Sequence, residues 1–168
     1  MIDADHVRTM ARYNRWQNRS LYAAADEIGE AARRLDRGAF FGSIHRTLSH
    51  LFWSDRMWMS RFDGGTKPDG PLEASPDWIA DWTDLAARRA EADEAILAWA
   101  GALTDAGTTG RLSWYSGLLG RDTEADRALC LAHFFNHQTH HRGQVHAMLT
   151  AAGARPEGTD LFTMPADA

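Results

Sequence analysis

Residues 130–146 read CLAHFFNHQTHHRGQVH, and a helical wheel gathers onto one stripe Cys130, Phe134, His137, His141, Val145 and Met148. Residues three and four apart share one face of a helix, so this stripe predicts a helix whose mostly apolar face carries two histidines into the core. Two imidazoles spaced in this way can hold one divalent metal ion. The spacing alone is a modest signal, because it lacks the glutamate of the HExxH motif and also suits a hydrogen-bonded pair of core histidines.

Three earlier segments repeat the helical spacing of apolar residues. We expect the four helices to span about 5–28, 43–62, 75–100 and 124–152. Ser43 and Ser75 are candidate N-caps, and Pro76 suits the first position of a helix. Residues 107–123 break the helical period and predict a short hairpin or an ordered crossover between helices three and four. The pattern therefore predicts an all-α four-helix bundle, built as a single domain over residues 1–168.

Length and composition narrow the functional classes. A chain of 168 residues is long enough to bury a sizeable core. The net charge is −5 and no block of lysine and arginine stands out, so nucleic-acid binding has no electrostatic support. The apolar runs stay well short of the ~18 residues that a membrane span needs. A single cysteine and the lack of a signal-peptide pattern favour a cytoplasmic location.

A third metal ligand is expected from the second helix, which offers His45 and His50. His50 lies at the edge of the apolar stripe and is the better candidate, although the wheel does not settle the choice. His133, one turn before His137, fits a ligand, a partner of a ligand or an ordinary half-buried histidine. The remaining histidines are expected at the surface or at an interface: His6, His140 and His146.

Two other polar residues interrupt apolar stripes. Asp55 lies among core positions of the second helix. It is expected to pair with an arginine of a neighbouring helix, and the alternative is a hydrogen bond to a metal-bound histidine. Cys130 shares the stripe of His137 and is expected in the core, because no motif activates it as a nucleophile.

Three motifs in order resemble the DinB (damage-inducible) family, which includes the YfiT-like proteins. They are YNRWQNRSL at 13–21, IHRTLSHL at 44–51 followed by Asp55, Trp58 and Arg61, and NHQTHHRGQ at 136–144. The resemblance implies a four-helix bundle with one long crossover connection. It also implies one divalent metal ion per chain, zinc or nickel, held by His50, His137 and His141, and it implies a homodimer.

The activity implied by the resemblance is that of a thiol-dependent enzyme. Relatives use glutathione, mycothiol or bacillithiol as S-transferases or maleylpyruvate isomerases, and a bound metal ion can lower the pKa of a thiol. We therefore expect a metal-dependent S-transferase, hydrolase or isomerase acting on a small molecule. Its catalytic acid or base is not identified, and the pocket-lining candidates are Tyr13, Asn14, Asn18 and Gln144. The alternatives are a metal-binding sensor or stress-response protein without turnover, and a structural dimer with hydrogen-bonded histidines.

Overall fold

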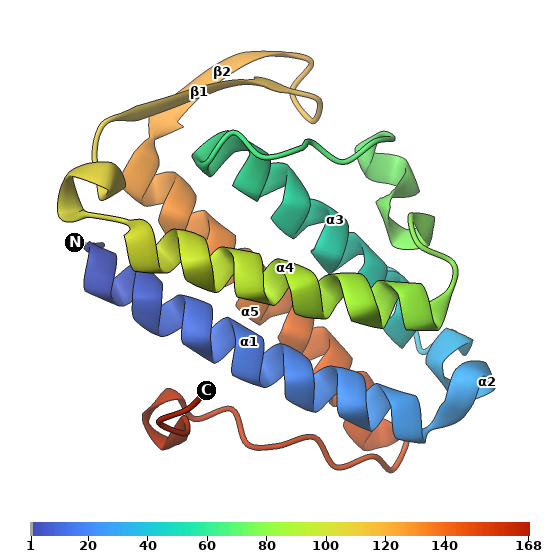
Figure 1. The fold of residues 1–168 in the computed structure, drawn as a ribbon. Coiled ribbons are helices and arrows are strands. Elements are labelled where there is room, and N and C mark those ends of the chain that lie inside the picture. The colour runs from blue at the N-terminus through green and yellow to red at the C-terminus, as the bar shows by residue number, and fades with distance from the viewer. Residues whose placement is uncertain (1) are drawn as a thin grey trace.

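Four long helices form a bundle in the computed structural model, which describes residues 2–168 (Figure 1). They are α1 (Ala4–Glu27), α3 (Ile44–Phe62), α4 (Trp82–Ala102) and α5 (Arg127–Ala151). The shorter elements are α2 (Gly29–Arg34), the 3₁₀ helices η1 (Leu72–Asp77), η2 (Asp105–Thr108) and η3 (Leu161–Thr163), and the strands β1 (Arg111–Ser116) and β2 (Arg121–Asp126). The predicted all-α bundle is confirmed.

Each long helix has two long neighbours. Helix α1 contacts α4 and α5, and α3 contacts the same two helices, so α1 and α3 lie diagonally across the bundle. Helices α3 and α4 run in the same direction, and residues 63–81 return along the bundle to join them (Figure 1). We call residues 63–81 the crossover segment. It is the one long crossover connection that the family resemblance implies, and η1 within it packs against α3.

The third helix starts later than predicted. Ser75 and Pro76 lie in the 3₁₀ helix η1, and α4 begins at Trp82, where the Asp81 carboxylate accepts a 2.7 Å hydrogen bond from the Asp84 amide. Two side chains of α3 bind the backbone of this stretch: Ser49 donates to the Ser75 carbonyl oxygen, and His45 donates to that of Ile79. These tertiary contacts override the local helix-start signal, and Ser75 as the N-cap was a wrong prediction.

Strands β1 and β2 form an antiparallel hairpin that pairs Arg111 with Asp126 and Ser116 with Arg121. Of the two alternatives predicted for residues 107–123, a short hairpin or an ordered crossover, the hairpin is confirmed. The second strand continues to Asp126, so α5 begins at Arg127, slightly later than the predicted start near Glu124. Asp126 then caps α5 through a hydrogen bond from the Ala128 amide.

The centre of the bundle holds a buried ion-pair network. Asp55 on α3 accepts a 2.7 Å hydrogen bond from Arg89 on α4, as predicted, and Arg89 also lies 2.8 Å from Asp93. The Asn18 amide of α1 donates to Asp93 at 2.9 Å. The three charged side chains are at most 3% exposed, so their charges are compensated by one another rather than by water.

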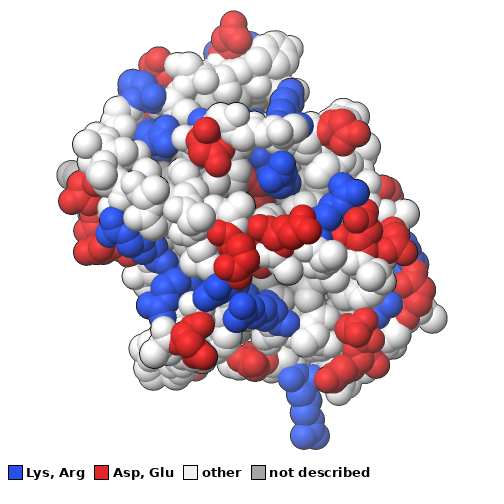
Figure 2. All heavy atoms as spheres, in the orientation of Figure 1, with Lys and Arg blue, Asp and Glu red and all other residues white. Residues whose placement is uncertain are grey.

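The surface carries both signs of charge. On the face drawn in Figure 2, lysine and arginine side chains are interspersed with aspartate and glutamate. Among the described residues, several arginines pair with an acidic side chain one helical turn away, such as Arg88 with Asp84. Within residues 2–168, no helix combines the length and apolar character needed to cross a membrane.

Candidate metal centre

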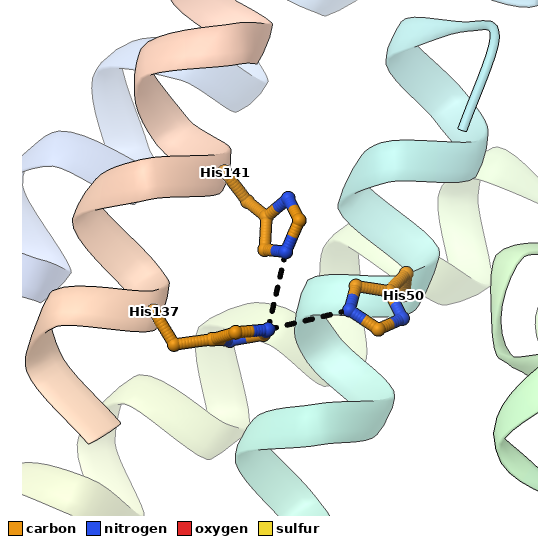
Figure 3. A group of neighbouring side chains, drawn as sticks. All are labelled: His50, His137 and His141. Atoms are coloured by element: carbon orange, nitrogen blue, oxygen red, sulfur yellow. Dashed lines mark hydrogen bonds between the residues drawn. The ribbon is translucent and has the colours of Figure 1, made fainter. Parts of the chain in front are cut away.

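Three histidines from two helices point toward one another between α3 and α5 (Figure 3). His50 lies on α3, and His137 and His141 lie one turn apart on α5. The Nε2 atom of His137 is 3.4 Å from Nε2 of His50 and 3.1 Å from Nε2 of His141. One ligand atom from each of the three residues lies within 4.8 Å of the others. The contact between α3 and α5 thus brings together residues that are 87 positions apart in sequence.

The outer nitrogens of two imidazoles have hydrogen-bonding partners. Nδ1 of His50 lies 2.7 Å from Oγ of Ser75 in the crossover segment. Nδ1 of His141 lies 2.8 Å from the amide oxygen of Gln144, which can only accept, so His141 donates through Nδ1. The Nε2 atom of neutral His141 therefore presents a lone pair to the cluster.

The environment keeps these imidazoles neutral. Burial, followed by the charge of neighbouring His141, lowers the pKa of His50 to about 4. Burial and the surrounding imidazoles lower the pKa of His137 to about 3. Burial also lowers the pKa of His141, and its hydrogen bond to Gln144 opposes that shift. Neutral imidazole is the form that binds a metal, so the cluster is in the binding form near pH 7.

The donor set fits a transition-metal ion. Two nitrogens at about 2.0–2.1 Å from a tetrahedral zinc ion stand roughly 3.3–3.4 Å apart, close to the two Nε2 separations around His137. One proton on His137 Nε2 can serve only one of its two neighbours, whereas a cation can interact with all three lone pairs at once. The arrangement is therefore compatible with metal binding, and the assignment of the three ligands stays a prediction.

Aromatic side chains pack against all three histidines of the cluster. The Phe41 ring centroid lies 4.1 Å from that of His50 and 5.4 Å from that of His141. The ring centroid of His133 lies 5.6 Å from that of His137 and 5.0 Å from that of Trp58. His50 and His141 are buried and His137 is half-buried, so solvent reaches the cluster mainly along His137.

The other predicted residues lie in different surroundings. His45 is buried, but it donates to Ile79 and belongs to the contact with the crossover segment. Cys130 is in the core, where burial raises the pKa of its thiol, as expected for a packing residue. Three outlying histidines are exposed or half-exposed, as expected: His6, His140 and His146.

Of the four pocket-lining candidates, only Gln144 contacts the cluster through a hydrogen bond among the described residues. The Tyr13 hydroxyl donates to the carbonyl oxygen of Thr159, and the Asn18 amide donates to Asp93. Asn14 is fully buried on α1. The polar groups of Tyr13 and Asn18 thus make contacts within the fold, and the role of the four residues in lining a pocket stays a prediction.

The sequence did not predict two residues that contact the histidine cluster, Ser75 and Phe41. The residues around Ser75 match the pattern of a helix N-cap, and this pattern gives no indication of its contact with His50. Phe41 lies in the connection between α2 and α3, where no periodic pattern indicates which side chains turn inward. Both contacts join segments that only the tertiary fold brings together.

The architecture is that of a helical bundle protein whose clustered histidines are suited to share a metal ion. The chain belongs to the DinB family, because the sequence model of that family matches residues 1–167. It is 27% identical to the protein DinB of Bacillus subtilis (strain 168) over 164 residues, which cover 94% of this chain and 92% of that relative.

A solved structure shows the same fold. A DinB-like protein from Bacillus cereus ATCC 10987 aligns with a TM-score of 0.52 over 85% of this chain and 90% of that chain. The two sequences are 17% identical over this alignment, so the likeness concerns the architecture alone.

Proposed function

We propose that this protein binds one divalent metal ion through the Nε2 atoms of His50, His137 and His141. The convergence of these three atoms is the observation that carries the proposal. Three neutral imidazoles suit zinc or nickel, and copper or iron would also be accepted by such ligands. Membership of the DinB family supports the same assignment.

We propose further that the site is catalytic and belongs to a thiol S-transferase, or to a related hydrolase or isomerase. A metal ion with an open coordination position would lower the pKa of a low-molecular-weight thiol and favour its thiolate form. His137 is the half-buried member of the cluster, so a small molecule would approach the ion along this residue. Phe41 covers His50 and His141 and would limit the access of water to that position. The protein would act as a homodimer.

Elemental analysis of the purified protein after dialysis tests the first part of the proposal. About one equivalent of zinc or nickel per chain is expected. A panel of thiols and electrophiles, assayed with the metal-loaded protein, then tests the second part. A loaded protein that transfers none of the thiols tested would contradict the transferase assignment, while metal-free wild-type protein that takes up no ion would contradict both parts.

One observation favours a second candidate, a metal-binding protein without turnover. A surface hollow of about 510 Å³ lies between α3, α4 and the crossover segment, and its lining includes Phe52, Trp78 and Arg88 but none of the three histidines. A substrate bound in this hollow would not contact the three histidines, so the hollow would not serve catalysis at the proposed metal site. Light scattering on the eluting protein, with and without metal, tests both the homodimer and a metal-dependent change of assembly.

A further inference from the structure

Ser75 is bound on both sides of its hydroxyl group. Its Oγ atom donates to the carbonyl oxygen of Leu72 at 2.6 Å and lies 2.7 Å from Nδ1 of His50. A hydroxyl group has one proton and two lone pairs. Because that proton is used by Leu72, Oγ can only accept from His50, so the imidazole must carry its proton on Nδ1. The residue is fully buried, so bulk solvent does not reach the hydroxyl group.

We propose that Ser75 is a positioning residue for the metal site, and that it holds His50 in the Nδ1–H tautomer. Neutral imidazole has one proton, so a proton on Nδ1 leaves Nε2 as a lone-pair donor aimed at His137 and His141. This inference rests on the proposed metal-binding function. It assigns to the crossover segment a direct part in preparing a ligand, because the hydrogen bond also fixes the orientation of the ring.

Gln144 performs the corresponding task for His141 from within α5. The two partners differ in origin. Gln144 lies three residues from its histidine, so the helix itself places it, whereas Ser75 lies 25 residues from His50 and reaches it only when the crossover segment is docked. The readiness of the His50 ligand therefore depends on the position of η1, while that of His141 does not.

Ser49 provides a matched control. It is buried next to His50, and its hydroxyl donates to the Ser75 carbonyl oxygen at 3.0 Å and accepts from the Ile79 amide at 3.3 Å. The Ser49→Ala variant thus removes two hydrogen bonds that dock the crossover segment and none that touches an imidazole. A loss of zinc affinity that is common to Ser75→Ala and Ser49→Ala reports on the docking of the crossover segment. Only the additional loss in Ser75→Ala reports on the orientation and tautomer of His50.

Competition with a chromophoric chelator gives the zinc Kd of the full chain and of both variants. Removing a partner of this kind weakens metal binding by about 10–100-fold in proteins generally, and we expect Ser75→Ala to raise the Kd by at least about tenfold relative to Ser49→Ala. Equal Kd values in the two variants would overturn the proposal. Wild-type protein that binds no zinc would instead defeat the proposed function, so the two failures are distinguishable.

The tautomer is read directly by long-range ¹H–¹⁵N correlation spectra of the metal-free wild-type protein. The signal of His50 is assigned by its loss in the His50→Gln variant. A protonated Nδ1 and an unprotonated Nε2 are expected at His50. A proton on Nε2 would overturn the proposal, even where Ser75→Ala fails to fold and yields no Kd.

Discussion

Replacing Arg89 by methionine tests how the buried charges at the centre of the bundle are balanced. Arg89 lies within 2.7–2.8 Å of both Asp55 and Asp93, and none of these side chains is more than 3% exposed. Methionine fills much of the same volume but leaves the two carboxyl groups without their ion-pair partner. Of the nearby charges, that of Arg142 remains to act on both of them. Removing one partner from a buried ion pair costs about 3–5 kcal/mol, and we expect a loss of this size in the free energy of unfolding at pH 7.

The pH dependence follows from the carboxyl groups. Burial already raises the pKa of Asp55 to about 6 and raises that of Asp93, while the charge of Arg89 opposes both shifts. Without Arg89 both pKa values rise further. A carboxyl group that is neutral in the folded state and ionised in the unfolded chain costs about 4 kcal/mol at pH 7 and about 1.5 kcal/mol at pH 5.

The folded variant therefore binds more protons than the unfolded chain, and its stability rises as the pH falls from 7 to 5. Asp55 of the wild type also takes up protons as the pH falls, so the wild type gains part of this stability. The difference in the free energy of unfolding between wild type and Arg89→Met should therefore be about 1–3 kcal/mol smaller at pH 5 than at pH 7. Urea unfolding followed by circular dichroism at both pH values measures it. Arg88→Met is the control, because Arg88 is 53% exposed and its pair with Asp84 is worth at most about 0.5 kcal/mol. A loss below about 1 kcal/mol at pH 7, or a difference that widens in acid, would refute the reasoning.

Three further outcomes are expected. His137→Ala and His141→Ala should each lower bound metal strongly in elemental analysis, with His146→Ala as the control on the same helix, and unchanged stoichiometry in both would defeat the ligand assignment. Protons compete with zinc for an imidazole nitrogen only when the pH is near or below the pKa of that imidazole. The pKa values of His50 and His137 are about 4 and about 3, so only His141 can take up protons in this range. The zinc Kd should therefore rise at most about tenfold as the pH falls from 7.5 to 5.5. Three imidazoles of ordinary pKa would lose about a thousandfold, which calorimetric titration would detect. Asp81→Ala should cost about 1 kcal/mol in urea unfolding, because it removes the cap of α4, and an unchanged midpoint would argue against this helix start.

The long helices were predictable because each repeats its apolar spacing over many turns, and such patterns depend only on nearby residues. The start of α4 was not predictable in this way. Ser75 and Pro76 suit both a helix cap and a 3₁₀ turn, and the choice is made by Ser49 and His45, which lie 26 and 34 residues from their partners in the crossover segment. No local pattern carries that information.

The histidine cluster also combines features that follow from local sequence patterns with features that depend on the tertiary fold. His137 and His141 were paired by their spacing, which is a local property of one helix. The choice between His45 and His50 needed the family resemblance, because both side chains are buried in the fold and burial alone does not separate them. What separates them is direction: His45 faces the crossover backbone at Ile79, whereas His50 faces α5.

Metal affinity and folding should be linked in this protein because of where the ligands lie. His50 and His137 are 87 residues apart, so the unfolded chain holds no preformed site and an ion held by them would bind the folded state in preference. Ligand at a hundred times its Kd then adds about 2.7 kcal/mol to the free energy of unfolding. The added stability acts between α3 and α5, and through Ser75 it reaches the crossover segment as well. Hydrogen exchange should therefore slow in η1 when zinc binds. If exchange slowed in α3 and α5 but stayed unchanged in η1, the crossover segment would not be coupled to the metal site.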